Sequence, residues 1–186
     1  MGKSMKTPIL ETSRLWLKPL KEEDAPGAFL WTGDPKVSWY MRYETHESLE
    51  DTKQWLREEE KQLDSDLLYD FGFHKKDNDE LIGSGGLTFN QQQGIWELGC
   101  NLRRDCWNQG YGTEAAAAIL SFAENTLHIH RVMARHAKDN AASGRVLEKN
   151  GFSFVRECWD QKWSGSHRFE LSLIHISEPT RLGMIS

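Results

Sequence analysis

The chain has 186 residues, of which 38% are hydrophobic and 27% charged, and this length favours a single domain with a sizeable core. No run of about 18 apolar residues occurs and the first residues lack a signal-peptide core, so we expect a cytoplasmic protein without a membrane partner. The net charge of −5, without a basic stripe, argues against a nucleic-acid partner. Three cysteines without a C-x-x-C spacing predict reduced thiols, neither a disulfide frame nor a zinc site.

The first half of the chain alternates short helices with strands. Residues 13–19 predict a strand in which apolar side chains alternate with polar ones, and an acidic start followed by Pro26 predicts a helix. After an aromatic loop over 33–47, Ser48 and Asp51 have the spacing of a capping box and predict a second helix. Three strand-like segments separated by polar turns then predict an antiparallel meander, over 67–75, 81–89 and 95–102.

The second half changes character at a glycine turn. Gly110 and Gly112 lead into an alanine-rich segment that predicts a helix from about Thr113. Further along, the patterns predict a strand, a helix closed by Gly151, and a hairpin, over 131–137, 140–150 and 152–176. The predicted fold class is therefore a mixed α/β (α+β) domain without an internal repeat.

The glycine turn is the clearest candidate for a binding site. Successive N–H groups at such a turn, together with the positive end of the following helix, form a nest for a phosphate or pyrophosphate. A dinucleotide fingerprint fits the spacing of Gly110, Gly112 and Ala115, but a meander precedes it and Arg135 lies where a ribose-binding acid is expected. A Walker loop is excluded because no lysine precedes Thr113.

Two ordered motifs resemble the GNAT superfamily of N-acetyltransferases, in particular its RimJ/RimL-type branch. Residues 102–115 are similar to that family's acetyl-CoA pyrophosphate loop, with Gly110 and Gly112 matching and Trp107 standing where Gln or Arg is usual. Residues 140–152 are similar to the branch's N-x-x-S…K-x-G-F helix. The resemblance covers roughly 13–170 and implies the GNAT fold, with antiparallel N-terminal strands, splayed central strands and flanking helices.

The resemblance implies acetyl-CoA as co-substrate and no metal. It implies that the pyrophosphate is held by the backbone N–H groups of Gln109, Gly110, Gly112 and Thr113. It also implies that the Leu102 and Arg104 amides face the acetyl and pantetheine groups, and that Asn140 orients the cofactor, caps its helix, or does both.

Two residues are candidates for catalysis. Glu97 shares a strand face with Ile95 and Gly99, out of step with its apolar neighbours, and the branch implies a general base there, acting through water; a solvated or salt-bridged glutamate is the alternative. Leu147 occupies the position of the family's usual tyrosine acid, which leaves Ser143 as the polar group near the sulfur. A helix serine bonded to its own backbone is the alternative for Ser143.

The implied activity is transfer of an acetyl group from acetyl-CoA to a primary amine, first of all a protein N-terminal amine such as that of a ribosomal protein. The alternatives are a small amine, such as a polyamine or an aminoglycoside, and a non-catalytic acyl-CoA-binding module. The aromatic loop around Tyr40 is the best indication of an acceptor site, and the glycines of 83–86 indicate a strand that needs close approach. Either a monomer or a homodimer is expected.

The last residues are judged separately. Residues 171–181 resemble the in-frame translation of a sequencing-library adapter. We therefore predict one N-acetyltransferase domain over 1–170 and a read-through tail over 171–186, whose first residues nevertheless have strand character.

Overall fold

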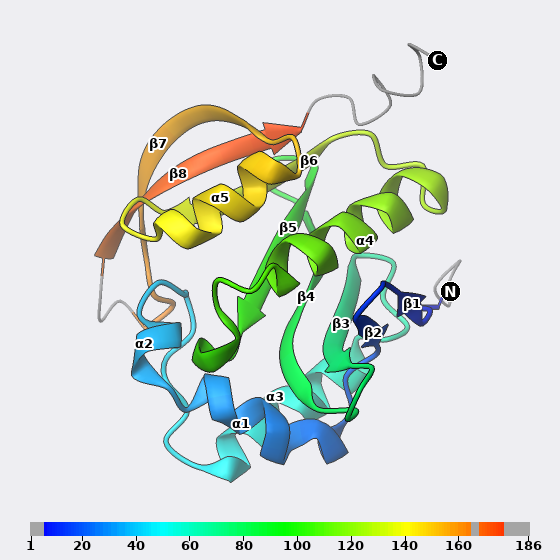
Figure 1. Cartoon of the computed structure of the whole chain (residues 1–186). Helices are drawn as coiled ribbons and strands as arrows, with labels where there is room; N and C mark the ends of the chain where they lie inside the picture. The colour runs from blue at the N-terminus through cyan, green and yellow to red at the C-terminus, as the bar shows by residue number, and fades with distance from the viewer. Residues whose placement is uncertain (1–5, 165–167, 177–186) are drawn as a thin grey trace.

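A computed structural model describes residues 6–164 and 168–176, and within them one mixed sheet of eight strands runs through the molecule (Figure 1). The strands lie in the order β1-β2-β3-β4-β5-β6-β8-β7, and every neighbouring pair is antiparallel except β5 and β6. In chain order they are β1 (Leu10–Glu11), β2 (Leu15–Lys18), β3 (Leu68–Lys75), β4 (Leu81–Asn90), β5 (Ile95–Leu102), β6 (Val132–Ala137), β7 (Ser153–Gln161) and β8 (Arg168–Ile176). The predicted mixed α/β fold, its meander and its last hairpin are confirmed.

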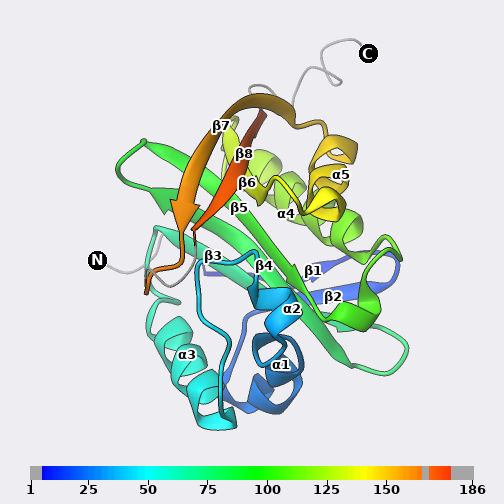
Figure 2. The same cartoon turned by 90° about the vertical axis from the view of Figure 1, so that its left-hand side faces the viewer.

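Helices cover both faces of the sheet. Figure 2 shows α1 and α3 on one side and α4 and α5 on the other. Their bounds are α1 (Ala25–Thr32), α2 (Pro35–Ser38), α3 (Leu49–Lys61), α4 (Tyr111–Asn125) and α5 (Ala141–Lys149), with 3₁₀ turns at Glu22–Asp24 and Arg104–Cys106. The short helix α2 and the two-residue strand β1 are additions to the predicted elements.

The main core lies between the sheet and α4. Tyr69, Phe71 and Phe73 of β3 are buried on this face, and they pack with Ile119 and Phe122 of α4. Strand side chains alternate between the two faces, so the even-numbered residues of β3 point toward α3 instead. This alternation decides which residues line each cavity described below.

Local signals in the sequence set the helix ends. Ser48 and Asp51 form the predicted capping box of α3, which stabilises a helix start by about 1 kcal/mol. Gly151 follows α5 with φ +83°, as predicted. Helix α4 begins at Tyr111, two residues earlier than expected, because Gly110 itself takes the left-handed conformation and serves as the N-cap.

The glycines of β4 let three backbones approach closely. A Cβ atom on Gly83, Gly85 or Gly86 would collide with the carbonyl oxygens of Asn101, Gly99 and Tyr69 respectively. The prediction of close approach is therefore confirmed, and the reason is that β4 lies tightly between β3 and β5.

The two central strands separate at one end. β5 and β6 run parallel and pair over three positions, from Trp96 with Val132 to Leu98 with Ala134. Both strands continue beyond this pairing, β5 to Leu102 and β6 to Ala137. The splayed central strands implied by the family resemblance are confirmed, and the opening connects the two faces of the sheet.

The C-terminal strand is an integral part of the sheet. β8 pairs with β6 from Ala137 with Leu171 to Val132 with Ile176, and it also pairs with β7. The part of the predicted tail over 171–176 thus forms a strand, whereas 177–186 lies outside the described residues; the boundary at residue 170 stays a prediction. Among the described helices, none combines the length and apolar character needed to cross a membrane.

Candidate functional site

Two cavities meet where β5 and β6 separate. The first, about 280 Å³, lies toward α4 and α5 and contains the glycine turn; we call it the cofactor cavity. The second, about 440 Å³, lies toward α3 and the loop over 39–47; we call it the acceptor cavity. Nine residues line both: Tyr40, Met41, Leu98, Gly99, Cys100, Asn101, Arg135, Asn140 and Ser143.

The cofactor cavity ends on the N-terminus of α4. Gly110 has φ +83°, and the first N–H groups of the helix, at Tyr111, Gly112 and Thr113, precede its first backbone hydrogen bond, from Glu114 N to Gly110 O. These residues line the cavity. Uncommitted N–H groups and the positive helix end make this a cradle for a phosphate, so the cavity fits the pyrophosphate of acetyl-CoA.

A carboxylate in the first turn of α4 would repel a bound phosphate, and the turn between β1 and β2 supplies partners that compensate its charge. Arg14 donates to Glu114 from its backbone N (3.0 Å) and its Nε (2.9 Å), and Thr12 Oγ1 donates at 2.5 Å. Although burial opposes the shift, these hydrogen bonds lower the pKa of Glu114 below its ordinary value. The negative charge is thereby held away from the cradle.

The other residues predicted for the cofactor divide into two groups. Leu102 lines the cofactor cavity, and its carbonyl accepts a hydrogen bond from Trp107 Nε1 at 2.9 Å, so the tryptophan fixes the end of β5. Arg104 and Gln109 line neither cavity. Arg104 Nε lies 3.0 Å from Asp34 Oδ2, and the Gln109 carbonyl accepts from Arg14.

Asn140 and Ser143 form a reciprocal pair at the start of α5. Asn140 Oδ1 accepts from the Ser143 amide at 3.2 Å, and Asn140 Nδ2 donates to Ser143 Oγ at 3.0 Å. The predicted capping role of Asn140 is confirmed. Ser143 Oγ accepts this bond, so its own hydrogen remains available to donate, and the residue lines both cavities.

Glu97 lies in the acceptor cavity on the α3 side of β5. Its side chain is 24% exposed, and its Oε1 lies 3.3 Å from Arg135 Nε. That nitrogen is buried and makes no hydrogen bond with any described residue, so Arg135 interacts with Glu97 as an ion partner, while the Glu97 side chain has a hydrogen bond with Asn90. Burial raises the pKa of Glu97 above its ordinary value, with the Arg42 guanidinium opposing the shift.

Asp160 of β7 contacts the guanidinium groups of both Arg42 and Arg135. Its Oδ2 accepts from Arg42 Nε at 2.7 Å and lies 3.4 Å from Arg135 Nη1. The last hairpin therefore contributes to the electrostatics around Glu97, although Asp160 is 63 residues away in the sequence. No local pattern in the sequence indicated this arrangement.

A buried lysine was also missed. Lys162 is 5% exposed, and its Nζ donates to the carbonyls of Ser38 (2.5 Å), Met41 (2.9 Å) and Tyr43 (2.8 Å). These contacts attach the end of β7 to the aromatic loop that lines both cavities. A lysine among polar residues gives no sequence signal for burial, because lysine is almost always exposed.

Cys100 lines both cavities but is unsuited to be a nucleophile. Burial, followed by the Asp70 carboxylate, raises the pKa of its thiol to about 12. The thiol is therefore protonated near neutral pH, and the thiolate that would carry an acyl group is absent. This favours direct transfer between two bound substrates.

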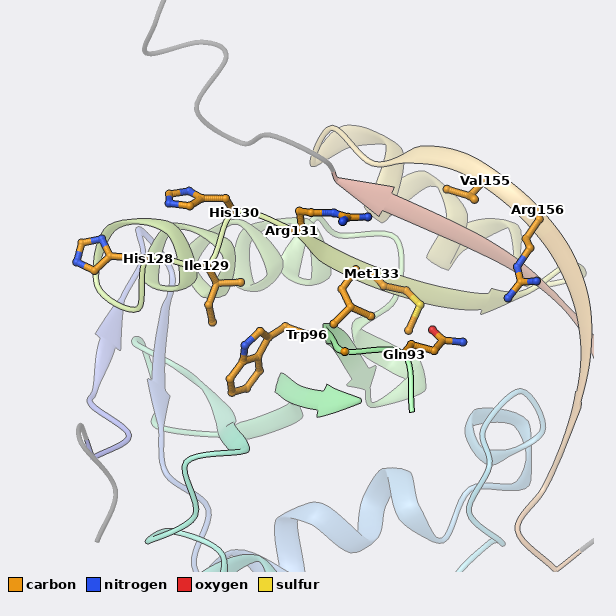
Figure 3. A pocket seen from close by; sticks show the side chains of 11 residues that line it. Gln93, Trp96, His128, Ile129, His130, Arg131, Met133, Val155 and Arg156 are labelled. Carbon is orange, nitrogen blue, oxygen red and sulfur yellow. The ribbon is translucent and has the colours of Figure 1, made fainter. Parts of the chain in front are cut away.

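A third cavity, about 560 Å³, lies at the opposite end of β5, where β5 and β6 are still paired (Figure 3). His128 and Arg156 lie at opposite ends of it in the figure, so its polar groups do not converge on one point. It also lacks the helix N-terminus and the strand opening that characterise the other two cavities. We therefore place the functional site at the junction of the cofactor and acceptor cavities.

Comparison with known proteins agrees with this geometry. Residues 14–153 match the model of the acetyltransferase (GNAT) domain family. The uncharacterized N-acetyltransferase YoaA of Bacillus subtilis is 30% identical over 146 residues, which covers 78% of this chain and 82% of the relative. The [ribosomal protein uS5]-alanine N-acetyltransferase of Escherichia coli is 32% identical over 85 residues, 44% of this chain and 43% of that protein.

Solved structures show the same fold. A GCN5-related N-acetyltransferase from Brucella melitensis aligns over 98% of this chain and 83% of its own, with a TM-score of 0.79 and 16% identity. A structure described as a putative ribosomal-protein-serine acetyltransferase from Vibrio cholerae aligns over 93% of this chain and 99% of its own, with a TM-score of 0.77 and 17% identity.

Proposed function

This chain belongs to the acetyltransferase (GNAT) family, and we propose that it transfers the acetyl group of acetyl-CoA to the α-amine of a protein N-terminus. One observation carries the proposal: two cavities on opposite faces of the sheet share a wall at the splayed ends of β5 and β6. A cofactor bound on one face and an amine bound on the other would meet there. The protein N-terminus is suggested by the relative named for ribosomal protein uS5 alanine.

The residues at the junction have complementary roles in this proposal. Bound acetyl-CoA supplies an activated thioester, and the first amides of α4 together with Gly110 hold its pyrophosphate. Asn140 orients it from the start of α5, and the Leu102 amide faces the pantetheine. Because Arg104 and Gln109 line neither cavity, we propose only backbone contacts at the edge of the cofactor for these two.

In this proposal, the residue that accepts the proton of the amine lies in the acceptor cavity. An α-amine has a pKa near 8, so most of it is protonated at neutral pH and must lose a proton before it attacks. We propose that Glu97 accepts this proton through water, and its raised pKa brings it closer to the operating pH. Ser143 and Tyr40 are the hydroxyl side chains that line both cavities, and we propose that Ser143 donates to the departing sulfur.

A small amine is the second candidate acceptor. The acceptor cavity contains two acidic side chains besides Glu97, namely Glu59 and Asp70, and its volume is that of a small-molecule site. Either acceptor is compatible with the same chemistry at the junction.

The test is incubation of the protein with acetyl-CoA and a panel of N-terminal peptides and small amines, followed by mass spectrometry of the products. We expect a mass increase of one acetyl group on the α-amine of at least one peptide. A protein that binds acetyl-CoA in calorimetry, yet acetylates no amine of the panel, would instead be an acyl-CoA-binding module.

A further inference from the structure

Two acidic side chains of the acceptor cavity lie within hydrogen-bonding reach of each other. Asp70 of β3 and Glu59 of α3 both line the cavity, and Asp70 accepts a hydrogen bond from the Phe71 amide at 3.2 Å. Within the described part of the chain, no lysine or arginine forms an ion pair with either carboxylate. The nearby cations of α3 are engaged elsewhere, since Arg57 pairs with Glu22 and Glu50 and Lys61 pairs with Glu58.

The environment of this pair favours occupation by a positive charge. Burial, followed by the Glu59 carboxylate, raises the pKa of Asp70 well above its ordinary value. A positive charge entering beside these two carboxylates would offset both their burial and their mutual repulsion. The cations of the same cavity, Arg42 and Arg135, are already compensated by Asp160 and Glu97.

Two paired glycines, Gly86 and Gly99, lie across the sheet between Asp70 and the junction of the cavities. Asp70 lies opposite Gly86 in the β3–β4 pairing, and Gly86 lies opposite Gly99 in the β4–β5 pairing. Directly paired residues share a face of the sheet, so Asp70 and Gly99 both lie on the α3 side, and Gly86 adds no side chain between them. A Cβ atom added to Gly99 would meet nothing within 4 Å, which shows open space at the junction end.

The strand register also sets the separation between Asp70 and the junction. Neighbouring strands are about 4.8 Å apart, so the Cα atoms of Asp70 and Gly99 lie about 10 Å apart across two strand spacings. Aromatic side chains also line the acceptor cavity, Trp31, Tyr43 and Trp55 among them. Aromatic faces and carboxylates together are the surroundings that bind ammonium and guanidinium groups.

We propose that Asp70 and Glu59 bind a second cationic group of the acceptor, two strand spacings across the sheet from Gly99 at the junction. This inference rests on the proposed function and narrows its substrate class to amines with two positive charges. Such a molecule is either an α,ω-diamine or a peptide whose basic side chain follows closely on its N-terminus.

The test compares diamines with monoamines of the same length. Initial rates with acetyl-CoA are measured for a series of α,ω-diaminoalkanes and the matching 1-aminoalkanes, in the wild type, Asp70→Asn, Glu59→Gln and the surface control Asp64→Asn. We expect the wild type to have a KM for the best diamine at least tenfold below that for the monoamine. Asp70→Asn and Glu59→Gln should raise the diamine KM about tenfold with kcat nearly unchanged, because the reacting groups are untouched, whereas Asp64→Asn should behave as the wild type.

Peptides separate the two sources of the second cation. Alanine-initiated peptides with lysine at position two, three or four are compared with the same peptides containing norleucine. A lysine preference that Asp70→Asn removes identifies a peptide acceptor, and a diamine preference without a lysine preference identifies a small amine. Both results support the second cation site.

Failure of the inference differs from failure of the proposed function. If diamines and monoamines have equal KM values in the wild type and in Asp70→Asn, the second cation site is wrong while the acetyltransferase stands. Calorimetry with the diamine alone tests the second cation site in the case that the protein acetylates no amine. Diamine binding that is weakened by Asp70→Asn, in a protein that acetylates nothing, would support the site and overturn the acetyl transfer; unchanged binding would overturn the site.

Discussion

The two cavities at the junction are built in different ways. The phosphate cradle of the cofactor cavity is formed by one continuous segment, in which a strand end, a glycine turn and a helix start follow one another from Leu102 to Thr113. The acceptor cavity is formed by residues from α1, the aromatic loop, α3, the four strands β3 to β6, the start of α5 and the last hairpin. A site made of consecutive backbone groups leaves a motif in the sequence, whereas a site made of dispersed side chains does not.

The largest effect is expected where the backbone itself is the binding group. Gly110→Trp fills the cradle and forces a side chain into φ +83°, so we expect acetyl-CoA affinity to fall more than 100-fold in calorimetry. Gly94→Trp is the matched control, since Gly94 also has a positive φ of 64° and lies outside both joined cavities. Comparable loss of affinity in the two variants would show backbone strain rather than loss of the cradle.

Prediction from the sequence succeeded where the signal was local. The alternation of Leu15 and Leu17, the capping box at Ser48 and the closing glycine at Gly151 each depend on a few neighbouring residues, and each is confirmed. Helix α2 was missed because its four residues are too few to show a period. The start of α4 was misplaced because the N-cap is a left-handed glycine rather than a polar side chain.

The next effect concerns the base on the acceptor side. Glu97→Gln removes the proton acceptor but keeps the shape of the side chain, so we expect kcat to fall about 100-fold with acetyl-CoA affinity unchanged. Since the working form of Glu97 is deprotonated and its pKa is raised, the wild-type rate should increase with pH through a value above that of an ordinary glutamate. The variant should lack this acidic limb in a pH–rate profile.

Glu157→Gln is the matched control for the base. Glu157 is an exposed glutamate of β7 that lies 3.3 Å from Lys138, outside both cavities. Its variant should keep the wild-type profile. A Glu97→Gln variant with full kcat and an unchanged acidic limb would assign the alternative role, a salt-bridged strand glutamate, to Glu97.

The hydroxyls at the junction should have a smaller effect, because they only donate a hydrogen bond. We expect Ser143→Ala to lower kcat about tenfold, in keeping with the roughly 1.5 kcal/mol of a single hydrogen bond to a developing charge. Tyr40→Phe is measured alongside it, since Tyr40 lines both cavities as well. A loss confined to Tyr40→Phe would transfer the donor role to the aromatic loop.

The acceptor side could be predicted only in part for a physical reason. Glu97 was singled out because the β5 alternation isolates it from its apolar neighbours, and the loop of Tyr40 because aromatic residues cluster there. Both residues line the acceptor cavity, and their roles stay predictions. Asp160 and Lys162 were not found, since their contacts cross 25 residues or more of sequence and depend on how the hairpin packs. The position of Asp70 relative to the junction likewise depends on the β3–β4–β5 register, which no local pattern indicates.

The smallest effect is expected at Glu114. Unlike Gly110→Trp, which lowers acetyl-CoA affinity, a change at Glu114 should lower stability and leave the affinity nearly unchanged. Glu114→Gln removes charged hydrogen bonds to Arg14 and Thr12, so we expect a loss of about 1 kcal/mol in the free energy of unfolding at neutral pH, with acetyl-CoA affinity within twofold of the wild type.

The pH dependence of this loss follows from the direction of the shift. The folded pKa of Glu114 is lowered, so the unfolded state binds more protons in that range. The stabilisation is present above the ordinary glutamate pKa and disappears as pH falls through the folded value. In denaturant titrations at decreasing pH, the free energies of unfolding of wild type and variant should therefore become equal. The control Glu124→Gln, on the same helix, should match the wild type at every pH. A stable Glu114→Gln variant with weakened acetyl-CoA binding would instead make this carboxylate part of the cradle. The cofactor cavity would then depend on a distant segment, the turn between β1 and β2, just as the acceptor cavity depends on distant segments.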